Sequence, residues 1–211
     1  MKYKIQFHSY WHCGSGLAAG ADVDALVVRD KDNFPCVPGK TIKGLVREAI
    51  ETIADFRGDD ANNAPGTVGP TKTCRTDAIR QAFGFFDDKD SALQGTLFFT
   101  NAELSSSERA AIKASGLQKH LYTTVSSTAI DDKGIAREHS LRRIEVVVPC
   151  ELEGTIMNVT DELKQGLTDA LRFIKRMGVS RNRGLGRCTI TICDEPEDCN
   201  KGKEAQPSPS A

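Results

Sequence analysis

The chain has 211 residues, a formal net charge of −1 and 39% hydrophobic residues. That length allows one medium-sized domain with a hydrophobic core, and the composition is not that of a disordered or fibrous protein. No segment approaches the roughly 18 apolar residues that a membrane helix needs, and the first residues do not resemble a signal peptide. We therefore expect a cytoplasmic protein with no membrane partner.

The seven cysteines are odd in number and contain no C-x-x-C pair, which argues against a disulfide framework. Cys188, Cys193 and Cys199 leave zinc binding open, although their spacing matches no structural zinc site. Charge is unevenly placed, because the segment 172–187 holds six basic residues and no acid: Arg172, Lys175, Arg176, Arg181, Arg183 and Arg187. A local basic patch indicates an anionic partner better than the total charge does.

The first segment, Tyr3–Phe7, alternates apolar and polar residues and predicts a strand. It leads into His12–Gly16, where two glycines favour a turn. His12 could contact RNA or act in acid–base chemistry, and a buried structural histidine fits the same pattern. Val27 and Val28 suggest a second short strand.

An amphipathic helix is predicted from Thr41, as its N-cap, to about Phe56. Apolar residues recur at steps of three and four and form one stripe: Ile42, Leu45, Val46, Ala49, Ile50 and Ile53. Lys40, Lys43 and Arg47 share another face near the helix N-terminus, where unpaired backbone N–H groups favour a phosphate. A solvated helix rim would give the same charge pattern.

The start of this helix, Gly39-Lys40-Thr41, resembles the end of a nucleotide-binding P-loop. That motif needs another glycine five residues before Gly39, and Phe34 stands there. The phosphate cradle of an NTPase therefore cannot form, and we exclude that class.

The middle of the chain predicts shorter elements. Residues 58–72 are rich in Gly, Pro, Asn and Asp, which indicates a loop within an insertion at about 57–77. A short helix over Ala78–Phe86, a strand over Gly95–Ala102 and a helix over Ser105–Ala114 follow.

The segment Tyr122–Arg143 predicts a long two-stranded hairpin that projects from the body of the protein. It is polar, with isolated β-branched residues around a turn at Asp131–Gly134. Because a core strand would carry more apolar bulk, we expect the apolar tips Ile130 and Ile135 to contact something outside the fold.

The remaining predicted elements are strands over Ile144–Cys150, Glu151–Ile156 and Cys188–Ile192 and a helix capped by Thr160 and ending at Gly178. The order strand, helix, strand, strand, helix, strand predicts an α+β, ferredoxin-like fold with antiparallel neighbours and helices on one face. The aromatic motifs with which RNA recognition motifs stack bases on the sheet are not visible. We expect one domain over residues 1–193 and a disordered acidic tail over 194–211.

The loop Gly178–Arg187 is rich in glycine and arginine and lies between the last predicted helix and strand. Its glycines let the backbone pass close to a ligand, and its polar side chains supply donors for phosphate oxygens. This pattern predicts contact with phosphate or RNA.

Four motifs occur together in this chain: His12–Gly16, Val23-Asp24 six residues before Asp30, Val37–Arg47 with the pattern Pro-Gly-x-x-x-Lys-Gly-x-x-Arg, and Gly178–Arg187. As a set they resemble the RAMP superfamily of CRISPR-associated proteins, and more closely the repeated backbone subunit of type III effector complexes. The resemblance covers most of residues 1–193.

That resemblance implies a palm similar to an RNA recognition motif (RRM-like) with a projecting thumb hairpin, to which Tyr122–Arg143 would correspond. It implies a chain that polymerises along a CRISPR guide RNA, with complementary target RNA, further backbone copies and other effector subunits as partners. The expected RNA-binding residues are His12, Ser15, Lys40, Lys43, Arg47, Ile130, Ser180, Arg181, Arg183, Gly184 and Arg187. It also implies target-RNA cleavage with Mg²⁺ or another divalent cation, in which Asp24 would be the catalytic residue and metal ligand.

The chain departs from the family pattern after Asp24, because Ala25-Leu26 stand where family members often carry Asn-Pro. Asp22 could take the role of Asp24 if the register differs, and some backbone subunits do not cleave, which leaves a non-cleaving RNA-binding scaffold open. A third interpretation is a CRISPR RNA-processing endoribonuclease with His12 as general base. That branch usually carries two ferredoxin-like domains, and this chain has room for one.

Overall fold

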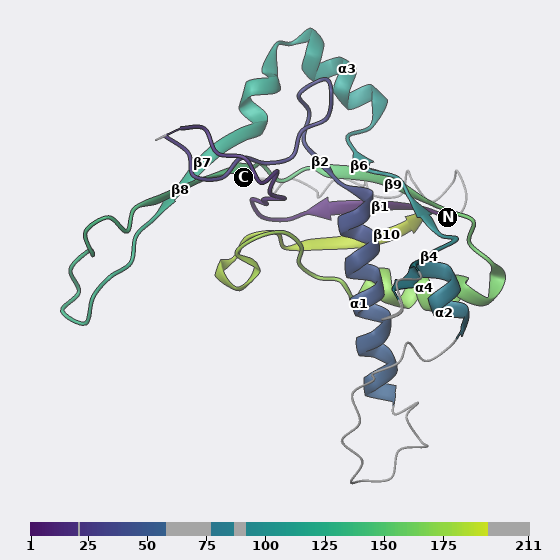
Figure 1. The fold of residues 1–211 in the computed structure, drawn as a ribbon. Coiled ribbons are helices and arrows are strands. Elements are labelled where there is room, and N and C mark those ends of the chain that lie inside the picture. Colours follow the sequence, from purple (N-terminus) through teal and green to yellow (C-terminus); the bar gives the residue numbers. More distant parts are fainter. Residues whose placement is uncertain (21, 58–76, 87–91, 194–211) are drawn as a thin grey trace, which may run out of the picture.

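A computed structural model describes residues 1–20, 22–57, 77–86 and 92–193 (Figure 1). Nearly all of the predicted insertion at 57–77 and the whole predicted tail at 194–211 lie outside the described residues. Among the residues that are described, no helix is long and apolar enough to cross a membrane.

The central sheet is antiparallel and has the strand order β10-β1-β9-β6-β2, with β5 also paired to β9. Its strands are β1 (Lys2–Phe7), β2 (Cys36–Val37), β5 (Phe98–Phe99), β6 (Ala102–Glu103), β9 (Glu151–Met157) and β10 (Cys188–Cys193). The register places Ile5 of β1 opposite Ile190 of β10 and Leu152 of β9. Opposite residues of paired strands point to the same face, so these three buried side chains form one apolar surface.

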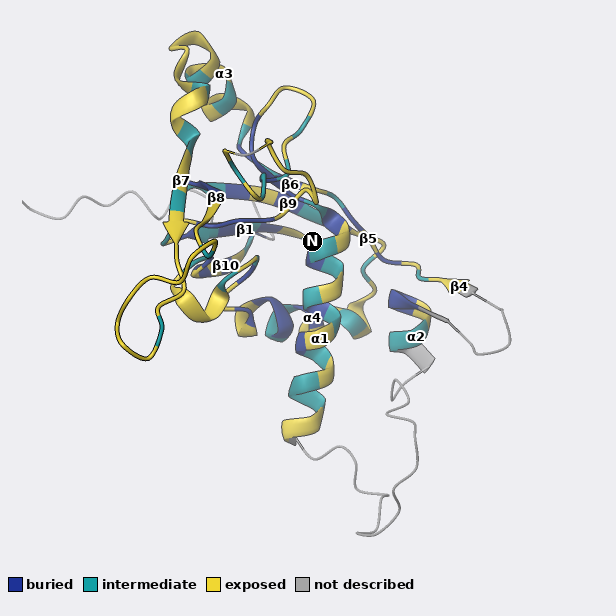
Figure 2. Ribbon diagram, turned by 60° about the vertical axis from the view of Figure 1, so that its left-hand side comes forward, coloured by how far each residue is buried: buried dark blue, intermediate teal, exposed yellow. Residues whose placement is uncertain are grey.

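Two helices, α1 (Gly39–Arg57) and α4 (Asp161–Phe173), pack against each other below this sheet in Figures 1 and 2. Their buried residues include Ile42 and Val46 of α1 and Leu167 and Leu171 of α4. Burying side chains of this size contributes about 1.5–3 kcal/mol each. The order of β1, α1, β5–β6, β9, α4 and β10 is that of a ferredoxin-like fold, so the predicted α+β class and RRM-like palm are confirmed.

On the other side of the sheet lies α3 (Ser106–Ala114), which is followed by the 3₁₀ turn η1 (Leu117–Leu121) (Figure 1). The predicted helix over Ser105–Ala114 is confirmed. Ser105 is its N-cap, and Ser105 and Glu108 form a reciprocal capping box that satisfies two backbone donors.

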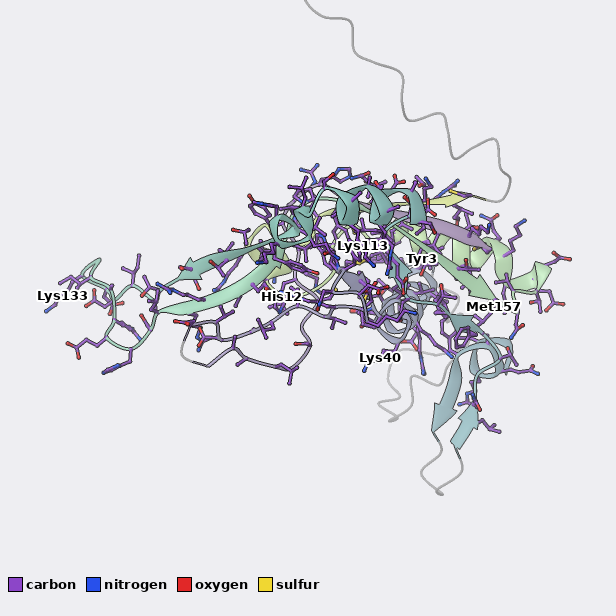
Figure 3. The ribbon with its side chains drawn as sticks, turned by 90° about the horizontal axis from the view of Figure 1, so that it is seen from above. Tyr3, His12, Lys40, Lys113, Lys133 and Met157 are labelled. Carbon is purple, nitrogen blue, oxygen red and sulfur yellow. The ribbon has the colours of Figure 1, made fainter. Side chains whose placement is uncertain are left out.

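The predicted projecting hairpin is confirmed, but its second strand runs to Val147 and includes most of the separate strand predicted over Ile144–Cys150. β7 (Tyr122–Ser127) and β8 (Arg142–Val147) pair with each other and project from the body, with Lys133 near the far end (Figure 3). Figure 2 shows that most of this thumb is exposed. Only the end of β8 enters the core, where Val146 and Val147 are fully buried.

Helix α1 begins two residues earlier than predicted, so Thr41 is not its N-cap. The first helical N–H, that of Gly39, is satisfied from another part of the chain, because Asn101 Oδ1 accepts it at 3.0 Å. Asn101 lies between β5 and β6, where the pairing with β9 is interrupted, so the single strand predicted over Gly95–Ala102 is two short strands.

Two other predictions are wrong in part. Val27 and Val28 form no strand; Val27 makes a single bridge to Gly14, and the strand before α1 is β2. The helix predicted over 78–86 is α2 (Asp77–Phe83) followed by β3 (Gly84–Phe86), which pairs with β4 (Ala92–Gln94). Gly84 has φ of 83°, a left-handed conformation that ends a helix.

Helix α4 ends at Phe173 and not at the predicted Gly178. Thr160 is its N-cap residue, although its side chain makes no capping hydrogen bond. After Phe173 the chain becomes extended, and Met177 N–H donates to Gly186 O at 3.0 Å. Pairing with the returning arm of the glycine-rich loop therefore replaces the last helical turn.

Candidate nucleic-acid interface

The glycine-rich loop 178–187 is built against the body of the protein. Gly178 and Gly186 have φ of 89° and 70°, and a side chain on either would overlap a backbone oxygen, that of His12 or of Met177. These two glycines therefore permit close packing of the loop on its own chain. Gly184, with φ of 90°, has open space around it and is the glycine that leaves room for a ligand.

Exposed arginines occupy the outer side of this loop. The turn η2 (Arg181–Arg183) carries Arg181 and Arg183, and Arg187 precedes β10. Ser180 starts the turn with φ of 57°, and its carbonyl accepts the Arg183 N–H at 2.8 Å. Within the described residues, these three arginines form no ion pair with a carboxylate. Other arginines do pair with carboxylates: Arg29, Arg47 and Arg109.

The structure adds residues that the motifs did not single out. Lys175, Arg176 and His8 join Arg187 and Thr189 around an open hollow of about 540 Å³ at the start of β10. His8 Nε2 lies 2.8 Å from Thr189 Oγ1. The excess of basic residues over 172–187 pointed to Lys175 and Arg176, whereas nothing local in the sequence pointed to His8.

The cations of α1 lie on another side of the molecule. Lys40 is exposed, but Lys43 Nζ donates to Leu97 O at 3.1 Å, and burial first and the charge of Arg47 second lower the pKa of Lys43. Arg47 pairs with Glu51 at 3.0 Å and reaches the backbone of β3. The opposite side of α1 faces the glycine-rich loop. The structure therefore does not bring these three cations together with the loop arginines.

The predicted catalytic carboxylate, Asp24, lies in the segment 22–29, of which residues 24–27 run along β8. Asp24 N–H donates to Arg143 O at 2.8 Å, and Asp24 Oδ2 accepts the Arg143 N–H at 2.7 Å. One step further, Glu145 N–H donates to Ala25 O at 3.0 Å. Asp24 is exposed and lies beside Arg143 near the start of β8, on a segment that is bonded to this thumb strand.

A buried carboxylate, Glu145, fixes this segment. Its Oε2 accepts the Val27 N–H at 3.1 Å, and its Oε1 pairs with Arg29 at 2.5 Å, while the Arg29 guanidinium lies over the Tyr122 ring. The backbone oxygen of Glu145 lies 2.5 Å from His12 Nδ1, and because a carbonyl only accepts, that nitrogen carries the hydrogen. His12 is 1% exposed, so its role here is structural, and RNA contact or general-base action would require its ring to leave the core.

Ser15 and Ile130 are both accessible. Ser15 Oγ donates to Leu26 O at 2.9 Å and so ties residue 15 to the segment 22–29. Ile130 and Ile135 are 63% and 62% exposed on the thumb, and their contact with a partner stays a prediction.

The described residues hold no group of three or more His, Cys, Asp or Glu that could bind a metal ion by themselves. Asp24 could supply one carboxylate ligand, and a divalent cation there would take its other ligands from RNA phosphates and water, which suits Mg²⁺. Cys188 and Cys193 are buried, and among these residues they belong to no group of three possible metal ligands. Cys199 lies outside the described residues.

Residues 4–189 match the family model described as "RAMPs: RAMP superfamily". The chain belongs to the RAMP superfamily. The match includes the palm, the thumb and the glycine-rich loop, so the resemblance found in the motifs is confirmed at the level of the superfamily. None of the curated proteins matches this RAMP protein.

Two solved structures have the same fold as this RAMP protein. A chain from the cryo-EM structure of a type III-B Cmr-beta complex bound to cognate target RNA aligns with a TM-score of 0.59 at 12% identity, covering 90% of this chain and 95% of that chain. A chain from the apo state of type III-B Cmr-beta aligns with a TM-score of 0.62 at 12% identity, covering 92% and 97%. Identity this low shows a shared fold.

Proposed function

We propose that this RAMP protein is an RNA-binding subunit of a type III CRISPR effector complex and forms its repeated backbone along the guide RNA. The superfamily membership and the fold shared with chains of type III-B complexes, one of them bound to target RNA, support this proposal. Its partners would be guide RNA, target RNA, further copies of the chain and other effector subunits.

The observation that carries the proposal is the set of exposed arginines on the glycine-rich loop. They have no carboxylate partner among the described residues, and they stand on a loop that both glycine packing and backbone hydrogen bonds hold in place. Guanidinium groups held in this way bind phosphates without reading bases. A guide whose sequence varies requires that kind of contact.

The test is RNA binding by the double variant Arg181→Ala, Arg183→Ala, measured by fluorescence anisotropy with single-stranded oligoribonucleotides of different sequence. Each lost phosphate contact should lower the slope of log K against log salt by about 0.7, so the double variant should lose about 1.4. Affinity should fall by a similar factor for every sequence. A sequence-dependent loss, or an unchanged slope, would contradict phosphate binding by this loop.

The matched control is Lys113→Ala, Lys119→Ala. Like the test variant, it removes two positive charges, here from exposed lysines of α3 and η1. These elements lie on the other side of the sheet from the α1–α4 layer (Figure 1). We expect the control to bind RNA with nearly the slope of the unmodified protein.

Target cleavage through Asp24 is a second proposed activity. It is supported by the position of Asp24, which is exposed beside the thumb strand β8 and is held by two hydrogen bonds with Arg143. A bound divalent cation would neutralise developing negative charge at the scissile phosphate. The part of Asp24 would be to hold that cation, while the bonding of residues 24–29 to β8 would keep the carboxylate in one place.

A further inference from the structure

Two hollows adjoin beside the glycine-rich loop, and their chemistry differs. The larger one, of about 540 Å³, is lined by cationic and neutral polar groups, among them His8, Arg187 and Thr189, and by no carboxylate. The smaller one, of about 170 Å³, lies between α1 and the end of α4. Both include Lys175 and Arg176 in their walls, so the two hollows meet at these residues.

The smaller hollow is lined partly by apolar side chains; the rest of its lining is polar or charged and consists of Glu48, Thr52, Lys175, Arg176 and Arg181. Leu45 and Ala49 of α1 form one wall, and Phe173 and Ile174 at the end of α4 form the other. Phe173 is 46% exposed, although a phenylalanine normally gains by burial. A volume of about 170 Å³ is that of about six liquid water molecules, enough for one flat ring system and too small for a segment of folded protein.

The two sides of the smaller hollow differ in charge. Glu48 lies on its α1 side and would repel a phosphate there. On the other side, Arg176 Nη1 donates to Arg181 O at 3.0 Å, which fixes that guanidinium at the border with the larger hollow. The ligand that fits both hollows therefore has an apolar ring at one end and an anionic group at the other, as a nucleotide does.

We propose that the smaller hollow is a base-binding subsite: one base of the bound RNA packs against Phe173, and the neighbouring phosphate lies on Arg176 and Arg187. This proposal rests on RNA binding by the loop and adds a contact that is not electrostatic. Stacking on an aromatic ring accepts every base, so the subsite is compatible with a guide of any sequence. A side chain of a neighbouring protein subunit is the competing occupant.

The experiment compares two oligoribonucleotides of equal length and charge, one with all its bases and one abasic throughout. The unmodified chain should bind the base-bearing RNA about tenfold more tightly, the scale of one stacked base. Phe173→Ala should lose most of that preference while its affinity for abasic RNA and its salt slope stay unchanged. Because Phe173 is half exposed, the variant should fold, which a thermal melt checks.

Phe98→Ala is the matched control, because Phe98 is 58% exposed on β5 and lies outside both hollows. It should keep the full preference for base-bearing RNA. Phe173→Ala binding both RNAs as the unmodified chain does would overturn the subsite, and so would an equal loss on both. A defect of Phe173→Ala in subunit assembly alone would assign the hollow to a protein partner. Unchanged RNA affinity of the loop variant Arg181→Ala, Arg183→Ala, by contrast, would overturn the proposed function itself.

Discussion

The buried carboxylate Glu145 gives the sharpest test of how the segment carrying Asp24 is held. Glu145→Ala leaves the buried Val27 N–H without an acceptor, which costs about 1–3 kcal/mol. It also leaves Arg29 without its ion-pair partner, and because Arg29 is 35% exposed, water recovers part of that loss. We expect a total destabilisation of about 3 kcal/mol. With an m-value of about 2 kcal/mol/M, the urea midpoint should fall by about 1.5 M.

Glu145→Gln should lower the free energy of unfolding about half as much, because its amide oxygen can still accept the Val27 N–H. Glu151→Ala is the matched control: Glu151 is 37% exposed, and its partner Lys4 keeps Glu153 at 3.2 Å, so the loss should stay below about 1 kcal/mol. Hydrogen exchange should show faster amide exchange over residues 24–29 in Glu145→Ala. Equal destabilisation by Glu145→Ala and Glu151→Ala, with amide exchange unchanged, would refute the role of Glu145 in holding this segment.

Three further predictions follow from the site and the core. Asp24→Ala should keep guide and target binding but slow metal-dependent target cleavage at least about 100-fold in the assembled complex, with Asp22→Ala less affected; cleavage unchanged by Asp24→Ala would exclude its catalytic role. Deletion of Ser126–Arg137 should leave a folded monomer that forms no regular filaments on guide RNA in electron micrographs, and ordered filaments would contradict docking by the thumb. Burial raises the pKa of Cys13 to about 12 and of Cys188 to about 11, so the unfolded chain releases these protons first as pH rises above about 8.5. Stability in urea should therefore decrease from about pH 9 to about pH 11, and a flat profile would contradict the burial of these thiols.

Local patterns predicted most of the fold. The stripe of Ile42, Val46 and Ala49 predicted α1, and the alternation of Tyr3–Phe7 predicted β1, because these residues bury one face in periods of 3.6 and 2. The predicted ends of helices and strands were wrong where a residue far away in the sequence determines them. Asn101 moves the start of α1 from Thr41 to Gly39 by accepting its first N–H, and no local pattern near Thr41 contains that information.

The candidate site was predictable to a smaller extent. Arg181, Arg183 and Arg187 are exposed and clustered, as the loop composition indicated. The sequence could not show that His12 is buried against Glu145, since 133 residues separate them. Nor could it show that Lys43 donates to Leu97 O or Arg47 to Gly84 O, because every residue carries a backbone oxygen. The ion pair of Arg47 with Glu51 could have been predicted, because the two residues lie four apart on one helix.

The most direct test of the central proposal is to purify the protein from its native cells and to size and sequence the RNA that comes with it. The proposal predicts short RNAs of CRISPR origin, in which a constant repeat sequence is joined to variable sequence, and their loss from the Arg181→Ala, Arg183→Ala variant. Recovery of no RNA, or of abundant cellular RNA fragments in proportion to their concentration, would contradict a guide-binding backbone subunit.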